Sequence, residues 1–523
     1  MAKNNKFKST SQKELFSSKN RKSSPEAAQP IPDFTCPHEN DIYLNDTPII
    51  SYLKNSGLGW LTSFSKFIFG LDLFEFKRNY KIRGRRPIHP AIMLSLILYG
   101  IIRGEFSLRG LEQLSKRDIG AMYLCRGLQP DHSTIGDFLL RHRHILNKDF
   151  LSQNIERIVA KASVDTSLSA IDGSVFEASA SRFNLLMKEA AEAKAKGLNE
   201  KAKKEPDNEK LQKQAAKYSE AVEVANKRAK EACLPPGEAK KLKVNLNEPE
   251  AALQKLKNGA GYRSGYKMII AATSGRLITG VEVHPTNEAS AVETLLEQHE
   301  KACGKAPDTA LLDAGFFTGG VLTMAMEREQ NILIPEGKAD MGEYDSKKIK
   351  QEFGKHKFKY DEVLDIYKCP EGKELRPANR SSSLGKKYMI YRCKECAVCK
   401  YFGQCTKSAH GRIVKRFEGD ELKEAMREVM KQGKAREVYR RRKEIVEPVF
   451  SVFRGVFGFR RFKRRGLEKV FMEAVLLSIA YNLKLAFETA GAGKYAFQLI
   501  ATDDFFVIFA LAVKYKPQSF KLT

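Results

Sequence analysis

Three acidic residues of this chain lie where a carboxylate has a chemical use. Asp172 follows the run Leu168–Ile171 and Asp313 follows the run Thr309–Leu312, and small residues come directly after each aspartate. This pattern predicts a buried strand that ends at the aspartate and opens into a loop. Glu447 lies in a stretch rich in arginine. Carboxylates that converge from such positions are the ligands that a pair of divalent metal ions needs for phosphoryl transfer.

A strand-end aspartate also has a structural use, because it can cap the next helix or start a turn. The surroundings of Glu447 favour chemistry over that alternative. On a helix, Tyr439, Lys443 and Glu447 share one face at i, i+4 and i+8, and Arg454 returns to that face two turns later. Pro448 predicts that the helix begins or kinks there. The same surroundings favour Glu447 over the neighbouring acid as the third ligand.

A dense basic segment follows the glutamate. Basic charge interleaved with aromatic residues beside an acid is typical of phosphate-backbone binding next to a metal site. A solvated basic face would carry compensating acids, and few appear. The residues expected to contact DNA here are Arg460, Arg461, Lys463 and Arg464, with Phe459 and Phe462 between them.

Five cysteines cluster before this segment. Repeated two-residue gaps let a tight turn direct two thiolates at one tetrahedral Zn²⁺, and four of the five would suffice. The alternative is a group of free thiols in a loop. The favoured zinc ligands are Cys369, Cys396, Cys399 and Cys405, with Cys393 as the spare.

The composition limits the partner. The chain has 523 residues and a formal net charge of +27, which favours a polyanion, most often nucleic acid, over a merely soluble basic protein. The basic first residues lack an apolar signal region. The longest late apolar run, 505–513, is far shorter than the roughly 20 residues that cross a bilayer. Clustered cysteines suit a reducing compartment, so a cytoplasmic protein without a membrane span is expected.

Residues 1–40 predict a disordered basic tail, and residues 41–150 predict a helical DNA-binding domain of helix-turn-helix type. Helices are expected over Pro90–Arg103 and Leu108–Met122, and a Ser or Thr in Pro130–Ile135 is expected to cap a third. A plain helical bundle is the alternative.

From residue 160 the pattern changes to strands alternating with helices. Ser274-Gly275 supplies the turn of a hairpin between Tyr266–Thr273 and Leu277–Val283. Further helices are expected at Glu288–Cys303 and Gly320–Arg328, and a strand at Asn331–Pro335. This order predicts an α/β fold with a mixed sheet flanked by helices. Two segments interrupt it: a long helical insertion at 183–258 and a small zinc-binding insertion at 365–412.

The acids belong to longer motifs. These are Asp172-Gly173-Ser174, Leu312-Asp313-Ala314-Gly315-Phe316, Tyr439-x-x-Arg442-x-x-x-x-Glu447-x-x-x-x-x-x-Arg454, Gly458-Phe459-Arg460-Arg461-Phe462, Ala480-Tyr481-Asn482-Leu483-Lys484, Gly84-Arg85-Arg86-Pro87 and Pro130-Asp131-His132-Ser133-Thr134-Ile135. Together they resemble the DDE transposases of prokaryotic insertion sequences. The matching branch has an amino-terminal helical domain and a cysteine-rich insertion before the catalytic glutamate.

This resemblance implies a ribonuclease-H-like catalytic domain at 160–490, followed by a carboxy-terminal extension at 491–523. Asp172, Asp313 and Glu447 map onto the family's three catalytic ligands for two Mg²⁺ or Mn²⁺ ions. Tyr439, Arg442 and Arg454 map onto its accessory DNA-binding signature. The last signature position is usually lysine, and the gap from Arg442 to Glu447 is one residue longer than usual. Arginine keeps the charge and can bind phosphate with two hydrogen bonds.

The implied function is metal-dependent DNA strand cleavage at the ends of a mobile element, followed by strand transfer into target DNA. The partners would be double-stranded DNA, as inverted-repeat ends and as target, and a second copy of the chain in a dimer or larger assembly, associated with the nucleoid. Three alternatives remain open: a metal-dependent nuclease on the same core, a non-catalytic zinc-containing DNA-binding protein, and an inactive copy of the enzyme.

Overall fold

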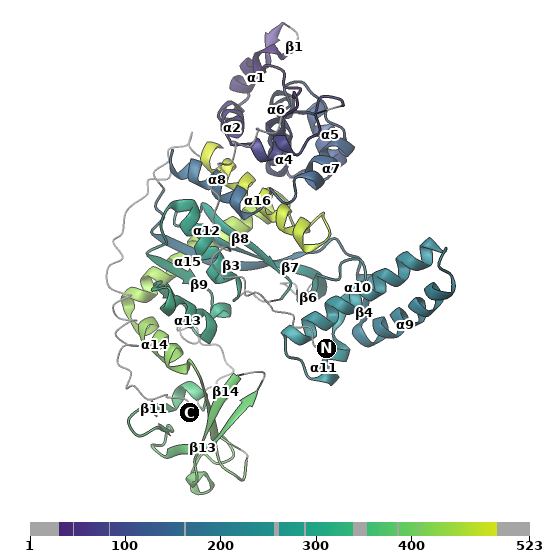
Figure 1. The fold of residues 1–523 in the computed structure, drawn as a ribbon. Coiled ribbons are helices and arrows are strands. Elements are labelled where there is room, and N and C mark those ends of the chain that lie inside the picture. The colour runs from purple at the N-terminus through teal and green to yellow at the C-terminus, as the bar shows by residue number, and fades with distance from the viewer. Residues whose placement is uncertain are drawn as a thin grey trace, which may run out of the picture.

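The computed structural model describes residues 31–44, 46–82, 84–161, 164–255, 261–286, 289–337, 353–383, 386–406 and 408–488 (Figure 1). Most of the predicted basic tail, residues 1–30, lies outside the described residues. So does the predicted carboxy-terminal extension, with its apolar run at 505–513.

A bundle of short helices forms the amino-terminal region. Every residue of its central helix α4 is buried, so this helix is the core of the bundle and not an outer face. Two sequence predictions were wrong in detail. The predicted helix over Leu108–Met122 is two helices, because the side chain of Asp118 accepts the Ala121 N–H and starts a new one. The cap of α7 is Asp131, whose carboxylate accepts the Thr134 N–H at 2.7 Å. The helices are α1 (Ile49–Asn55), α2 (Trp60–Phe69), α3 (Phe74–Arg78), α4 (Pro90–Ile102), α5 (Leu108–Arg117), α6 (Ile119–Leu124), α7 (His132–Arg141) and α8 (Lys148–Val159).

The central sheet is mixed, as the sequence predicts. Its strand order is β10-β9-β3-β7-β6, with β8 also paired to β7. The strands β10, β9 and β3 run parallel, while β7 is antiparallel to β3, β6 and β8. The predicted hairpin is β7–β8. The strands are β3 (Leu168–Glu177), β6 (Ala252–Lys255), β7 (Tyr262–Thr273), β8 (Ile278–His284), β9 (Thr309–Leu312) and β10 (Ile332–Leu333).

The first strand differs from the prediction. β3 does not end at Asp172 but continues to Glu177, because the backbone after the aspartate stays paired with β7 from Ile269 to Gly265. Gly173 and Ser174 are therefore strand residues. The second aspartate does follow its strand directly, since β9 ends at Leu312.

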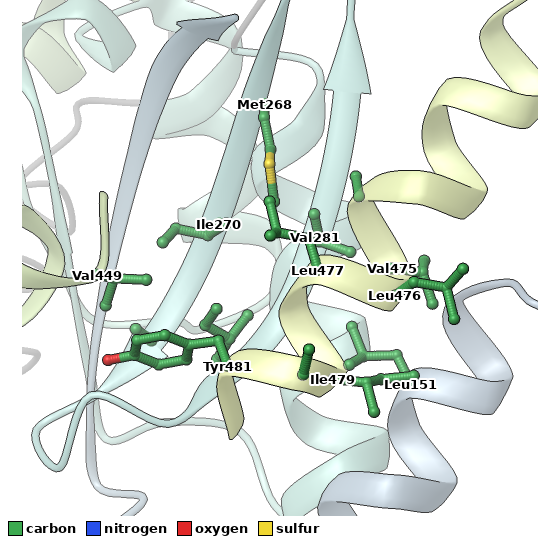
Figure 2. Close-up of a cluster of buried hydrophobic side chains, with 14 of the residues drawn as sticks. Leu151, Met268, Ile270, Val281, Val449, Val475, Leu476, Leu477, Ile479 and Tyr481 are labelled. Atoms are coloured by element: carbon green, nitrogen blue, oxygen red, sulfur yellow. The ribbon is translucent and has the colours of Figure 1, made fainter. Parts of the chain in front are cut away.

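Helices cover both faces of this sheet. Neighbouring residues of β7 point to opposite faces, and Met268, Ile269, Ile270 and Ala271 are all fully buried. Figure 2 shows side chains of the last helix packed against Met268, Ile270 and Val281, with Leu151 of α8 beside them. The helices around the sheet are α12 (Ala291–Cys303), α13 (Gly319–Glu327), α14 (Asp420–Lys431), α15 (Gly433–Ser451) and α16 (Leu467–Glu488).

The apolar character of α16 is explained by this packing. Its stretch Leu467–Phe487 is long and apolar enough to cross a membrane, but 72% of that window is buried inside the protein. A core helix of a folded domain passes the same test. Two hydrogen bonds fix the position of α16 against β8. The side chain of Asn482 accepts the Ile278 N–H at 2.9 Å and donates to the Ile278 carbonyl at 2.8 Å.

Two segments leave the sheet. After β3 the chain forms a helical hairpin of α9 and α10, closed at its base by the strand pair β4–β5, and returns through β6 (Figure 1). These elements are β4 (Leu185–Met187), α9 (Lys188–Lys204), α10 (Glu209–Glu231), α11 (Pro236–Lys241) and β5 (Lys243–Asn245).

The cysteine-rich segment contains an antiparallel five-stranded sheet in the order β11-β12-β13-β14-β15, which the sequence did not predict. It leads into α14 and α15. Its strands are β11 (Lys359–Asp361), β12 (Ile366–Lys368), β13 (Glu374–Ser383), β14 (Lys386–Arg392) and β15 (Ile413–Phe417).

Candidate active site

Asp172 and Asp313 lie on adjacent parallel strands. Ile171 of β3 pairs with Leu312 of β9, so the two aspartates are the next residues along the same register. Arg442 of α15 contacts both carboxylates. Its Nη1 lies 3.2 Å from Asp172 Oδ2, and its Nη2 lies 3.3 Å from Asp313 Oδ1. The fold therefore brings together two residues that are 141 positions apart in the chain, and one cation joins them.

The electrostatics of this group follow from burial. The Asp172 side chain is 20% exposed, and its desolvation raises the pKa, which Arg442 opposes and the nearby Asp313 reinforces. Burial alone lowers the pKa of Arg442, but the adjacent Asp172, Tyr439 and Asp313 raise it overall. The guanidinium therefore stays charged, and it offsets the repulsion between two carboxylates held side by side.

On helix α15, Tyr439 is buried against the sheet, whereas Glu447 is exposed to solvent. Tyr439 is buried and donates from its hydroxyl to the Leu312 carbonyl at 3.1 Å, and burial raises its pKa to about 12. Glu447 is exposed, and within the described residues its carboxylate makes no hydrogen bond or ion pair. Of the three residues predicted to share one helix face, Tyr439 is therefore buried, while Lys443 and Glu447 are exposed.

The helix does not begin at Pro448, which was one of the two predicted outcomes. α15 continues through it to Ser451 and is followed by a π-helical turn at Val452–Val456. Proline has no N–H to donate to the Glu444 carbonyl. That carbonyl instead accepts a hydrogen bond from Arg276 Nε at 3.1 Å. A side chain from the β7–β8 turn therefore replaces the missing helical bond.

Arg454 contacts the strand that carries Asp172. Its Nη2 donates to Ser174 Oγ at 2.6 Å and to the Val175 carbonyl at 3.1 Å, and its guanidinium lies over the Phe176 ring. In this arrangement Arg454 holds the continuation of β3 beside α15. Arg454 is half-buried and Tyr439 is buried, and their contact with DNA stays a prediction.

The basic segment after α15 is bound to the end of β3. The Phe462 N–H donates to the Glu177 carbonyl at 2.9 Å, and Arg461 donates to the carbonyls of Ala178 and Ala180 at 2.8 Å each. Phe459 and Phe462, which are interleaved with the basic residues, are buried. Arg464 is half-buried, which lowers its pKa. Arg460 and Lys463 remain exposed.

Sequence reasoning missed the carboxylates that hold this segment. Glu473 of α16 accepts the Lys463 N–H at 3.0 and 2.9 Å and the Arg464 N–H at 3.1 Å. Burial raises the pKa of Glu473 to about 7. Glu248 accepts the Gly466 N–H at 2.7 Å. The available signal for Glu473 was an acid inside an otherwise apolar helix.

Neither predicted set of metal ligands is assembled as a cluster. Within the described part of the chain, no group of three or more His, Cys, Asp or Glu side chains could hold a metal ion. The carboxylates of Asp172 and Asp313 both pair with Arg442, and among the described residues neither of them contacts Glu447. Their oxygens nevertheless have the donor chemistry that Mg²⁺ prefers.

The five clustered cysteines line one cavity of the small sheet domain together with Leu375 and Arg412. Cys393 is buried in the apolar core, and desolvation raises its pKa to about 11. Cys396 Sγ accepts the Arg412 N–H at 3.2 Å. Thiols have the donor chemistry of a zinc site, but the predicted group of Cys369, Cys396, Cys399 and Cys405 is not gathered around one point.

Comparison with known families addresses the identity of the chain. A family model described as "Transposase DDE domain" matches residues 368–486, and one described as "Transposase domain (DUF772)" matches residues 64–141. The chain belongs to the DDE transposases. None of the curated proteins compared with it matches.

This membership implies an enzyme that cuts DNA with divalent metal ions. The two matched regions of the transposase differ in what they contain. The first runs from β12 to within α16 and includes Glu447 and Arg442, while the second runs from within α2 to the end of α7. Asp172 and Asp313 lie outside both. The structural support for grouping these two aspartates in one site is the register of β3 and β9.

Proposed function

We propose that this transposase cuts the ends of a mobile element and joins them to target DNA at one site formed by Asp172, Asp313 and Glu447. The observation that carries the proposal is the register of β3 and β9, which sets two carboxylates side by side next to the helix of the third. The strand order β8-β7-β3-β9-β10, with β7 alone antiparallel to its neighbours, supports a core of the ribonuclease-H type.

Two Mg²⁺ or Mn²⁺ ions held by these acids would lower the pKa of a water or a 3′-hydroxyl and stabilise the leaving oxygen. The chain's own residues prepare the site. Arg442 contacts both aspartates and offsets the repulsion between them, and its fork can exchange carboxylate for phosphate. Tyr439 fixes α15 against the end of β9 through the Leu312 carbonyl. Glu447, exposed further along the same helix, would complete the metal site.

The test is to replace Asp172, Asp313 or Glu447 singly by Ala and to measure nicking of duplex DNA that carries the element ends. Each substitution is expected to lower the rate at least about a thousandfold, because a lost metal ligand removes several kcal/mol of transition-state stabilisation. Glu444→Ala is the matched control, since Glu444 is an exposed acid on the same helix. Near-normal nicking by one of the first three variants would remove that residue from the site.

Joining is tested separately from cutting. The wild-type chain is expected to link the 3′ end of a pre-cut element end to a circular duplex target. Cutting without joined products would favour the metal-dependent nuclease. Binding without metal-dependent cutting would favour the non-catalytic DNA-binding protein.

We also propose that the cysteine domain takes up Zn²⁺ through four of its thiols. Support comes from the shared cavity of the five cysteines and from the N–H that Arg412 directs at Cys396 Sγ, as thiolate ligands commonly receive. Zinc content after dialysis is expected to be about one equivalent in the wild type and in Cys393→Ser. It is expected to be lost in Cys396→Ser. Zinc-free wild type that folds normally would contradict this proposal.

A further inference from the structure

One face of the small cysteine-rich sheet is open to solvent. In the β14–β15 pair, Tyr388 lies opposite Phe417, Ile390 opposite Lys415, and Arg392 opposite Ile413. Directly paired residues point to the same side of a sheet, and every second residue does so along a strand. These six residues therefore share one face, called here the outer sheet face.

The other face of the same strands forms the core of the small domain. Tyr391 and Val414, which alternate with the residues of the outer sheet face, are buried beside Leu375 and Cys393. The cysteine cavity lies on this inner side, because Leu375 and Cys393 line it. The outer sheet face is thus the side on which the described residues of the domain place no apolar cover.

The centre of the outer sheet face is aromatic and aliphatic. The rings of Tyr388 and Phe417 are 5.0 Å apart between centroids, with an angle of 48° between their planes. Ile413 is 41% exposed, and Ile390 is partly exposed. Apolar side chains left at the surface of a flat sheet mark an interaction site when they are contiguous.

Cations surround this apolar centre. Arg392 and Lys415 are exposed, and Lys415 Nζ lies 4.6 Å from the centre of the Tyr388 ring. On β13, Arg376 pairs in register with Arg392 and is 78% exposed. The nearby acid Glu374 is already paired with Arg376 at 3.0 Å. From Cys369 to Phe417 the sequence holds twelve Lys and Arg against three Glu, so this short segment carries a net +9 of the chain's +27.

We propose that the outer sheet face binds an unpaired DNA strand, with bases stacked on Tyr388 and Phe417 and phosphates paired with Arg392 and Lys415. Aromatic rings accept the faces of bases, and those faces are accessible only where the strand is not in a duplex. Cations alone would bind duplex phosphates equally well, so the aromatic centre is what selects the unpaired strand. The inference rests on the proposed function, in which cutting produces such strands at the element ends.

The experiment measures binding of the full-length chain, without added divalent metal, to fluorescent oligothymidylate and to a duplex of equal length. Tyr388→Ala and Phe417→Ala are each expected to weaken oligothymidylate binding between about fivefold and about 150-fold, the range for losing one base–aromatic stack. Duplex binding is expected to stay within about twofold. Tyr388→Phe and Phe417→Tyr keep a ring and are expected to bind as the wild type does.

Phe402→Ala is the matched control. Phe402 is 42% exposed and belongs to the same domain, but it lines the cysteine cavity on the other side of the sheet. This variant is expected to leave binding of both DNAs unchanged.

Equal losses on oligothymidylate and duplex, or no loss in the two alanine variants, would overturn the inference. The assay contains no metal, so strand binding is measured independently of cutting. A chain that bound the strand through this face but never cut DNA would contradict the proposed function and leave this inference standing.

Discussion

Two regions of this transposase combine basic and aromatic residues, and the fold uses them in opposite ways. In the segment from Phe459 to Lys469 the rings are buried, and Arg461 is committed to the backbone after β3. On the outer sheet face the rings of Tyr388 and Phe417 are only partly buried and lie beside the exposed cations Arg392 and Lys415. Similar composition therefore yields an anchor for the strand of Asp172 in one region and an open platform in the other.

The difference comes from what lies behind each ring. Phe459 and Phe462 pack against Phe176 and Tyr266 of the central sheet, with ring centroids between 5.3 and 6.1 Å apart. The small sheet has only one face to bury, and its alternate residues already fill that core. A high density of basic residues thus predicts that a region binds a polyanion. Whether its aromatic rings can contact that polyanion depends on whether the rest of the protein already buries them.

The largest expected effect separates the two kinds of ring. Phe462→Ala removes a ring that is fully buried, so the free energy of unfolding should fall by about 3–5 kcal/mol. Phe417→Ala should cost about 1 kcal/mol or less, because its ring is partly solvated already. Urea denaturation followed by circular dichroism measures both. Equal losses of unfolding free energy in the two variants would contradict the distinction between buried rings in one region and partly exposed rings in the other.

A second effect concerns the carboxylate that holds the basic segment. The pKa of Glu473 is raised from 4.5 to about 7 by burial, so the folded protein binds this proton more tightly than the unfolded chain does. The resulting stabilisation is fully present below about pH 4.5 and is lost as the pH rises to about 7. Its full size is on the order of 3 kcal/mol.

Glu473→Gln cannot titrate, so the fall in unfolding free energy over that pH range is expected to disappear from its urea denaturation curves. Glu468→Gln changes an exposed acid on the same helix and is the control that should keep the wild-type slope. An unchanged slope in Glu473→Gln would show that Glu473 is not the group that titrates.

Local patterns predicted the elements but not their partners. The β7–β8 hairpin and the strand before Asp313 follow from turn chemistry and short apolar runs. The continuation of β3 past Asp172 could not be predicted, because Gly173 and Ser174 have low strand propensity and are held there by pairing with β7. The small sheet was missed because the spacing of its cysteines outweighed weak strand signals.

For the candidate site too, the sequence predicted individual residues but not the contacts between them. Strand-end reasoning found Asp172 and Asp313, and their adjacency then follows from strand pairing. The ion pairs of Arg442 join residues 129 and 270 positions apart, and no local pattern encodes such contacts. The exposure of Glu447 likewise depends on which side of α15 meets the sheet.

Two adjacent arginines offer a third and smaller test. Arg461→Ala removes hydrogen bonds to the Ala178 and Ala180 carbonyls, so it should lower the unfolding free energy by about 2 kcal/mol. Arg460 is exposed and its side chain has no such contact within the described residues. Arg460→Ala should keep full stability and weaken duplex binding, with a salt slope smaller by about 1. The reverse pattern would exchange their roles.

The smallest expected effect tests whether the cations of the outer sheet face meet phosphates. Lys415→Ala should weaken oligothymidylate binding a few-fold and reduce the slope of log affinity against log salt by about 0.7, the contribution of one phosphate in a single strand. Lys394→Ala is the matched control, since Lys394 is exposed in the cysteine loop and lies over no aromatic ring of the described residues. A weaker affinity with an unchanged slope would mean that Lys415 acts through the Tyr388 ring, over which it lies, and not through a phosphate. In that case the platform would bind by stacking alone, and the net charge of the small domain would have to act elsewhere along the DNA.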